Sequence, residues 1–136
     1  MKKNKTIFFA ITIISFLIAF SACNHERITE VRILYTPIAT YSAEPVHCDL
    51  FEFAFDKIIK EQDVGDKDFL EKIGSEIQTL TMVEDTFIID VRIKCFVKYT
   101  NKLDTLCITN NGLILVNGSL MDRNENLVNR IRNKIY

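Results

Sequence analysis

The sequence predicts a single small α+β domain, in which an antiparallel sheet carries helices packed on one face. Three segments, at residues 86–100, 103–109 and 112–118, show strand patterns separated by short polar turns. Two further segments, after Asp66 and after Asn124, carry apolar residues at helical spacing. Strands and helices come in runs and do not alternate regularly, which is typical of an α+β fold.

The first half of the domain is expected to contain one strand and one short helix. Residues 31–36 alternate as in a strand, and a loop at 37–45 follows. The next stretch, DLFEFAFDKIIKEQ at 49–62, is ambiguous, because its phenylalanines alternate as in a strand while its charged residues lie opposite apolar ones at helical spacing. Since Asp49 and Glu52 resemble a capping box, we predict a helix, with a strand as the alternative.

Two amphipathic helices complete the helical part of the fold. Asp66 and Asn124 stand at the positions where a side chain would cap the first turn. The apolar stripe of the first helix consists of Phe69, Leu70, Ile73, Ile77 and Leu80, and that of the second consists of Leu127, Val128, Ile131 and Ile135. Each stripe is wide enough to cover one face of a sheet.

The alternation of the long strand fixes which side chains face the helices. These are the odd-numbered residues Ile89, Val91, Ile93, Cys95 and Val97. A hairpin that turns at 101–102 would place Ile108 opposite Cys95 and would point Cys107 to the other face. The Asn-Gly pair that follows would place Leu115 opposite Ile108. Cys95 and Cys107 are therefore not expected to form a disulfide.

The polar side of the same strand is the candidate contact surface. Arg92, Lys94 and Lys98 project from this side together with Phe96. A basic row with an aromatic residue would suit an anionic glycan, a lipid headgroup or an acidic protein, whereas a solvated face without a partner is the alternative. On either interpretation, replacing the three bases by glutamine should leave folding nearly unchanged.

The N-terminus has the pattern of an export signal. Three lysines precede an apolar stretch at 7–20, which is shorter than the roughly 20 residues of a membrane-spanning helix and ends in small residues. The following Phe20-Ser21-Ala22-Cys23 resembles the lipobox of bacterial lipoprotein precursors. The resemblance implies that Cys23 is acylated and becomes the first residue of the mature chain, with an ordinary signal cut after Ala22 or an uncleaved anchor as alternatives.

This resemblance implies a domain organisation and a location. Residues 1–22 would be the signal peptide, 23–30 the lipidated N-terminus and a short tether, and 31–136 the single domain. Several acyl chains on Cys23 would anchor the protein stably in a membrane of the bacterial cell envelope. Asn24 favours the outer membrane, by resemblance to known sorting rules.

Charge argues against a nucleic-acid partner. From Cys23 onward the chain has 14 basic and 18 acidic residues, a formal net charge of −4, and nucleic-acid binding requires a basic surface. The acids are concentrated in residues 44–85, with 12 acids and 4 bases, whereas residues 86–136 hold 4 acids and 8 bases. The two halves are therefore expected to attract one another.

The remaining cysteines and histidines give no clear chemical site. Cys48, Cys95 and Cys107 have no CxxC spacing, so we expect buried free thiols, although one internal bridge is possible in an oxidising compartment. Cys48 beside His47 is the alternative catalytic pair, but neighbouring residues point in different directions. With two histidines and no ligand cluster, we expect no metal site, no cofactor and no catalytic set.

These observations leave three classes of function. The favoured hypothesis is a membrane-tethered binding or inhibitor module that acts on an envelope protein or an anionic glycan. An accessory subunit of an envelope complex is the second hypothesis, and a small enzyme is the third. The domain also resembles small bacterial lipoproteins of uncharacterised activity through Asp90-Val91-Arg92 and the turn Asn117-Gly118.

Overall fold

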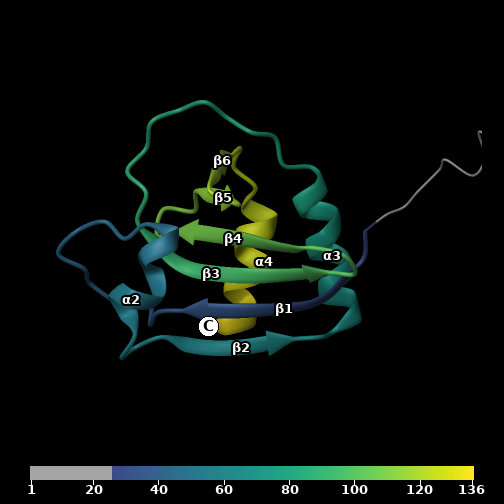
Figure 1. The fold of residues 1–136 in the computed structure, drawn as a ribbon, viewed down its shortest axis with the longest axis horizontal. Helices are drawn as coiled ribbons and strands as arrows, with labels where there is room; N and C mark the ends of the chain where they lie inside the picture. Colours follow the sequence, from purple (N-terminus) through teal and green to yellow (C-terminus); the bar gives the residue numbers. More distant parts are fainter. Residues whose placement is uncertain (1–25) are drawn as a thin grey trace, which may run out of the picture.

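The structure is a computed structural model that describes residues 26–136, so the predicted signal peptide and Cys23 lie outside the described residues. Six strands form one antiparallel sheet in the order β2-β1-β3-β4-β5-β6 (Figure 1). In chain order the elements are β1 (Ile28–Tyr35), the 3-10 helix η1 (Cys48–Leu50), α2 (Phe51–Phe55), β2 (Lys60–Val64), α3 (Lys67–Gln78), β3 (Val91–Tyr99), β4 (Leu103–Thr109), β5 (Ile114–Val116), β6 (Ser119–Met121) and α4 (Glu125–Ile135). The predicted α+β class is confirmed.

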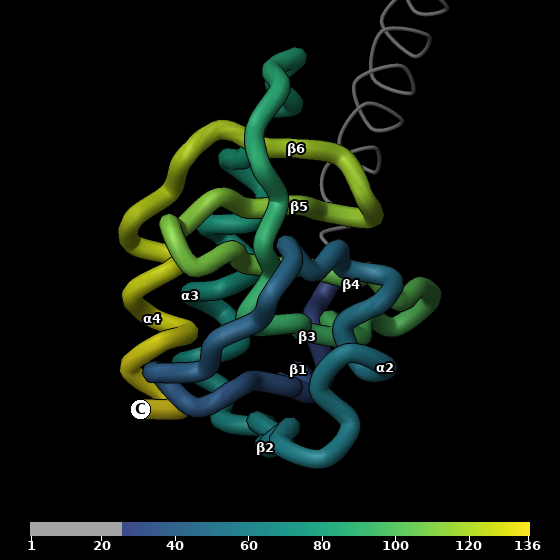
Figure 2. The backbone as a smooth tube through the Cα atoms, turned by 90° about the vertical axis from the view of Figure 1, so that its left-hand side faces the viewer, coloured from purple at the N-terminus to yellow at the C-terminus, as the bar shows by residue number. Residues whose placement is uncertain are grey.

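The sheet separates two apolar clusters. Figure 2 shows α3 and α4 on one side of the strands and α2 on the other side, with the loop between β1 and α2 crossing the end of the sheet. The larger cluster lies between the sheet and the two long helices, as the apolar stripes predict. A smaller cluster lies under α2 and consists of Leu34, Val46, Phe51, Phe55, Val91, Cys107 and Leu115. The second face of the sheet is thus partly covered and is not fully open to solvent.

Both long helices begin where the sequence predicts. The side chains of Asp66 and Asn124 each accept a hydrogen bond from the backbone N–H three residues later, at 2.8 and 3.0 Å. Each cap satisfies a donor that the first turn of a helix leaves without an intrahelical partner. The helices are also joined to each other by Arg130 of α4, whose Nη2 lies 2.7 Å from Oε1 of Glu76 on α3.

The helix predicted over 49–62 is wrong in the second half of its length. Only η1 and the five residues of α2 are helical, and the end of the stretch forms β2, an edge strand paired with β1. In α2, Phe51 and Phe55 lie one turn apart and are buried, while Phe53 is exposed. No side chain caps α2, so the predicted capping box of Asp49 and Glu52 does not form.

The first strand begins earlier than predicted. β1 starts at Ile28, which is buried against the larger cluster, so residues 28–30 belong to the domain and not to a tether. The predicted boundary at residue 31 is therefore three residues too late. The sequence did not indicate a strand at 28–30 because two of these three residues, Thr29 and Glu30, are polar.

The predicted register of the first hairpin is wrong by two residues. Cys95 pairs with Leu106, and Ile108 pairs with Ile93. The turn lies one position earlier than predicted, at residues 100–101, since Tyr99 N–H donates to the carbonyl of Lys102 at 2.8 Å. A shift of two residues keeps each side chain on its face, so Ile108 still faces the helices.

The next hairpin and the start of β3 differ from the prediction by a change of face. Leu115 pairs with Cys107 and packs in the smaller cluster, because the turn between Thr109 and Leu113 contains three residues, 110–112, instead of two. The register also shifts at the start of β3, so Val91 and Ile89 pack under α2 instead of facing the long helices.

A sixth strand, which was not predicted, follows the turn at Asn117-Gly118. Asn117 and Gly118 both adopt positive φ, 50° and 83°, which is the conformation of a two-residue hairpin turn. Val116 and Ser119 pair across it, so that β6 is added to the sheet. This short strand was not predicted because its three residues are too few to show a period.

Candidate functional site

A disulfide joins the second face of the sheet to the segment that covers it. Cys48 of η1 is bonded to Cys107 of β4, with a Cα–Cα distance of 6.0 Å. The expectation of free thiols is therefore wrong for these two cysteines, although Cys95 and Cys107 lie on opposite faces as predicted. The loop that the bond closes spans 59 residues in sequence, which no local spacing pattern reveals. Because the sulfur of Cys48 is bonded, the alternative pair of His47 and Cys48 has no thiol nucleophile.

Cys95 is the free and fully buried cysteine of the described residues, and burial raises the pKa of its thiol from 9.0 to about 12. The unfolded chain loses this proton above pH about 9, whereas the folded protein keeps it. The contribution of the buried neutral thiol to the free energy of unfolding is complete below pH about 9 and is lost as the pH rises toward 12. Denaturation at several pH values should show a free energy of unfolding that falls by about 1.4 kcal/mol per pH unit in this window, relative to Cys95→Val. Parallel pH profiles for the two proteins would contradict this expectation.

The predicted basic contact surface is largely covered. Lys94 is 8% exposed, and its Nζ lies 2.7 Å from a carboxylate oxygen of Glu52 on α2. Arg92 donates from Nη2 to Asp90 at 2.7 Å and to Ser42 at 2.8 Å. The prediction that these two bases are exposed is therefore wrong. The segment before β2 folds across them because its phenylalanines and acids complement this face of the sheet.

The other two residues of the predicted surface lie nearer to solvent. Phe96 is half-buried, with the guanidinium of Arg32 5.0 Å from its ring centroid and the ammonium of Lys94 5.4 Å from it. Lys98 is exposed, and its Nζ lies 3.6 Å from a carboxylate oxygen of Glu30. Each of the four predicted residues thus already has an intramolecular partner, and the row does not offer free cations to an anionic ligand.

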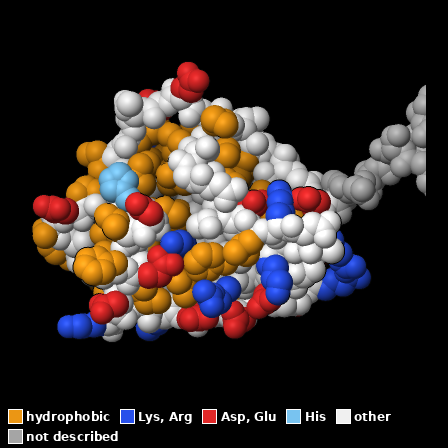
Figure 3. Space-filling model, viewed as in Figure 1, with side chains coloured by type: hydrophobic (Ala, Val, Ile, Leu, Met, Phe, Trp, Pro, Cys, Tyr) orange, Lys and Arg blue, Asp and Glu red, His pale blue; other side chains and the backbone are white. Residues whose placement is uncertain are grey.

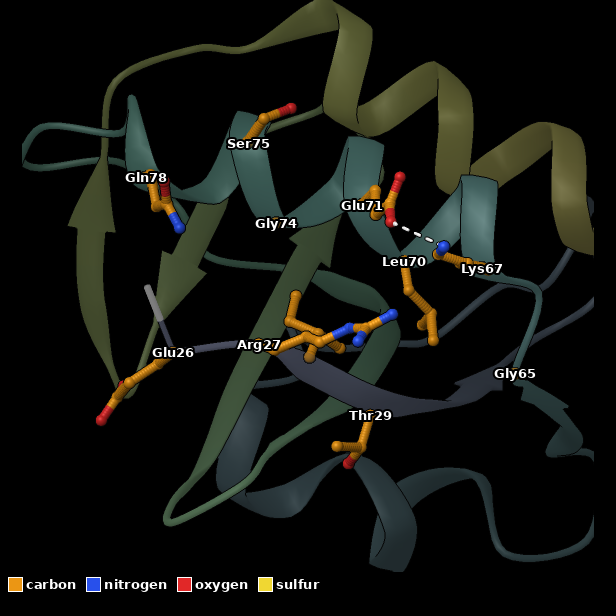
Figure 4. A pocket seen from close by; sticks show the side chains of 11 residues that line it. Glu26, Arg27, Thr29, Gly65, Lys67, Leu70, Glu71, Gly74, Ser75 and Gln78 are labelled. Carbon is orange, nitrogen blue, oxygen red and sulfur yellow. Dashed lines mark ion pairs between the residues drawn. The ribbon is translucent and has the colours of Figure 1, made fainter. Parts of the chain in front are cut away.

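A groove of about 690 Å³ lies between the start of β1 and α3 (Figure 4). Figure 4 shows the side chain of Arg27 lying along it, below the ion pair of Lys67 with Glu71, whose Nζ and Oε1 are 3.8 Å apart. Its apolar floor is formed by Ile28 and Leu70, both of which are already buried in the core. The groove therefore has charged residues of both signs along its edge and an apolar floor.

A smaller groove of about 430 Å³ lies on the second face, beside the disulfide. Cys48, Ile89 and Leu115 supply apolar walls, while His47 and Asp49 are exposed at its edge. Its volume falls within the range of small-ligand pockets, and Lys94, which is paired with Glu52, also lines it. It opens toward the surface described next.

Two segments form an acidic and apolar surface at the end of the sheet where β1 ends and β3 begins. The segments are residues 41–56 and 84–90, and we call this surface the acidic apolar end. They are held together where Val46 N–H donates to Asp90 Oδ1 at 3.1 Å and Val91 N–H donates to the carbonyl of Val46 at 2.8 Å. In Figure 2 both segments lie on the side that faces the viewer.

Exposed apolar side chains are concentrated there. Five of the ten exposed large apolar side chains in residues 26–136 belong to these two segments, which contain 23 of those 111 residues. They are Tyr41, Leu50, Phe53, Phe87 and Ile88. Figure 3 shows hydrophobic side chains gathered around the pale blue histidine, with acidic side chains among them. Apolar surface that remains exposed in this way is typical of an interaction site.

The charge of this surface is negative throughout. Its two segments contain seven acidic residues and neither lysine nor arginine. The acids are Glu44, Asp49, Glu52, Asp56, Glu84, Asp85 and Asp90. Sequence reasoning placed the contact surface on the basic row instead, although the run of acids without bases at 41–56 was visible in the sequence.

Comparisons with known proteins give no further information on the chain, because no family model, curated protein or solved structure matches it. Within residues 26–136, no group of three or more His, Cys, Asp and Glu side chains is arranged to hold a metal ion. In that same part of the chain, no helix has the length and apolar character needed to cross a membrane.

Proposed function

We propose that this protein is a lipid-anchored binding module of the bacterial cell envelope. The observation that carries the proposal is the position of the two segments of the acidic apolar end, which hold five of the ten exposed large apolar side chains of residues 26–136 and lie at the opposite end of the sheet from the start of β1 (Figure 1). A domain tethered at one end and apolar at the other is arranged to hold a partner away from the membrane surface.

The start of β1 supports the tethered arrangement. Ile28, the first residue of the sheet, follows Cys23 by five positions, and extended chain covers about 3.3 Å per residue. A lipidated Cys23 would therefore hold the domain within about 20 Å of the lipid headgroups. The acidic apolar end would then point toward the compartment and not toward the bilayer.

The disulfide supports an exported location. Bonds such as Cys48–Cys107 form and persist in oxidising compartments, of which the bacterial envelope is one. The bond also fixes η1, and with it α2, against β4. It therefore keeps Leu50 and Phe53 exposed in a defined position, which a binding surface requires.

The anchor is tested by replacing the proposed lipidated residue. Cys23→Ala should abolish acylation and move the protein from the membrane fraction to the soluble envelope fraction, because the remaining chain would have no lipid to hold it. Fractionation of cells, followed by mass measurement of the purified protein, checks this expectation. Cys95→Ala is the matched control and should remain in the membrane fraction.

Wild-type protein that is soluble and carries no acyl group would contradict the anchor. Wild-type and Cys23→Ala proteins that both remain in the membrane fraction would show that Cys23 is not the attachment point. Either result would leave the binding surface to be tested separately.

A further inference from the structure

We propose that the acidic apolar end binds a cationic amphipathic segment of a protein, with lysine or arginine beside large apolar side chains. This inference names the partner class and rests on the proposed function of a binding module. It is carried by two independent observations, the charge of the surface and the exposure of its apolar side chains.

Charge selects a basic partner. Five of the seven acids are exposed, namely Glu44, Asp49, Asp56, Glu84 and Asp85. The nearby bases of β3 do not neutralise them, because Arg92 is paired with Asp90 and Lys94 with Glu52. A basic segment would be attracted to this end over a distance of about 10 Å and would meet no lysine or arginine within the two segments.

Apolar contacts would supply most of the affinity. Phe53 is 87% exposed at the centre of α2, and Leu50, one helical turn before it, is also exposed. Across the joined segments, Phe87 and Ile88 add further exposed area. The groove beside the disulfide lies next to this surface and can receive one apolar side chain of the partner. Aromatic anchors beside a pocket are typical of the residues that dominate binding energy.

The same features argue against two other occupants. An anionic lipid surface would be repelled by the five exposed acids, and the surface lies away from the start of β1. A second copy of this chain would bring two acidic surfaces together, and like charges placed opposite each other oppose association. A basic polypeptide satisfies both the charge and the apolar character.

The test uses a defined peptide probe and the full-length chain with Cys23→Ala, which keeps the measurement independent of the anchor. The probe is an amphipathic peptide of leucine and lysine, about 18 residues or five helical turns long. Fluorescence anisotropy should show saturable binding, and Phe53→Ser should weaken it about tenfold, because one aromatic anchor is lost. Raising the salt concentration to about 0.5 M should also weaken binding, since exposed charges are screened.

Two controls make the test specific. Leu103→Ser changes another exposed apolar residue, 59% exposed, at the start of β4 and away from the acidic apolar end, and should leave the affinity unchanged. A peptide in which glutamate replaces every lysine should not bind. Unchanged melting temperatures would show that both serine variants are folded.

Equal binding of the lysine and glutamate peptides, or an equal effect of Phe53→Ser and Leu103→Ser, would overturn the inference. So would binding that requires the protein to dimerise, as measured by light scattering. These results concern the partner class alone. The proposed function is contradicted by a different result, namely that crosslinking in intact cells finds no protein in contact with this surface.

Discussion

Replacing both Cys48 and Cys107 by alanine is expected to lower the free energy of unfolding by about 4 kcal/mol. The bond closes a loop of 59 residues, and a cross-link of this span removes much of the conformational freedom of the unfolded chain. Urea denaturation of the wild-type and double-variant proteins, without reductant, measures the difference. The loss should also release η1 and α2, since Cys107 lies in the cluster beneath them.

Reduction provides the matched control for this experiment. The wild-type protein in reductant should approach the stability of the double variant, while the double variant should not respond to reductant. A wild-type denaturation midpoint that is unchanged by reductant would contradict the bond or its contribution to stability. Peptide mapping of the oxidised protein should recover Cys48 joined to Cys107 and Cys95 as a free thiol.

The second large effect is expected at the ion pair between α2 and β3. Glu52→Gln should lower the free energy of unfolding by about 2 kcal/mol, because it leaves the ammonium of Lys94 without its partner in a largely buried position. We expect less than for a fully buried pair, since the side chain of Glu52 is 43% exposed and water screens it. Thermal and urea denaturation check the value.

A second substitution distinguishes the cost of leaving the buried charge of Lys94 unpaired from the cost of lost packing. Lys94→Met in the Glu52→Gln background removes that charge and should recover most of the lost stability. Lys98→Gln, which changes an exposed lysine of the same strand, should alter stability by about 0.5 kcal/mol or less. Equal effects of Glu52→Gln and Lys98→Gln would mean that burial of Lys94 does not matter. Because Lys94 is buried and paired, replacing all three bases of the row by glutamine should lower the stability, contrary to the expectation from the sequence.

The long helices and the central strands were predictable because their signals are local. The caps at Asp66 and Asn124 and the stripes behind them all indicate helix, and the alternation in β3 and β4 indicates strand. Errors arose where the outcome depends on contacts between distant segments. Lys60–Val64 became an edge strand because β1 was available to pair with it, and nothing in its own five residues indicates this.

The candidate site was harder to predict for the same reason. The alternation of Arg92 and Lys94 with apolar residues correctly indicates the face of the strand, yet it does not indicate whether another segment covers that face. Glu52 lies 42 residues before Lys94, and Cys48 lies 59 residues before Cys107. Such pairings are fixed by the packing of α2, whose position the sequence alone does not determine.

The most direct test of the proposed binding module is photo-crosslinking in intact cells, from a photoreactive residue placed at Phe53 and, as a control, at Leu103. Both positions are exposed, but only Phe53 belongs to the acidic apolar end. We predict that the probe at Phe53 crosslinks to one envelope protein, through a segment rich in lysine or arginine, while the probe at Leu103 does not. Crosslinks from Phe53 to acidic or neutral segments would contradict the inferred partner class, and no protein crosslink from Phe53 would contradict the binding module itself.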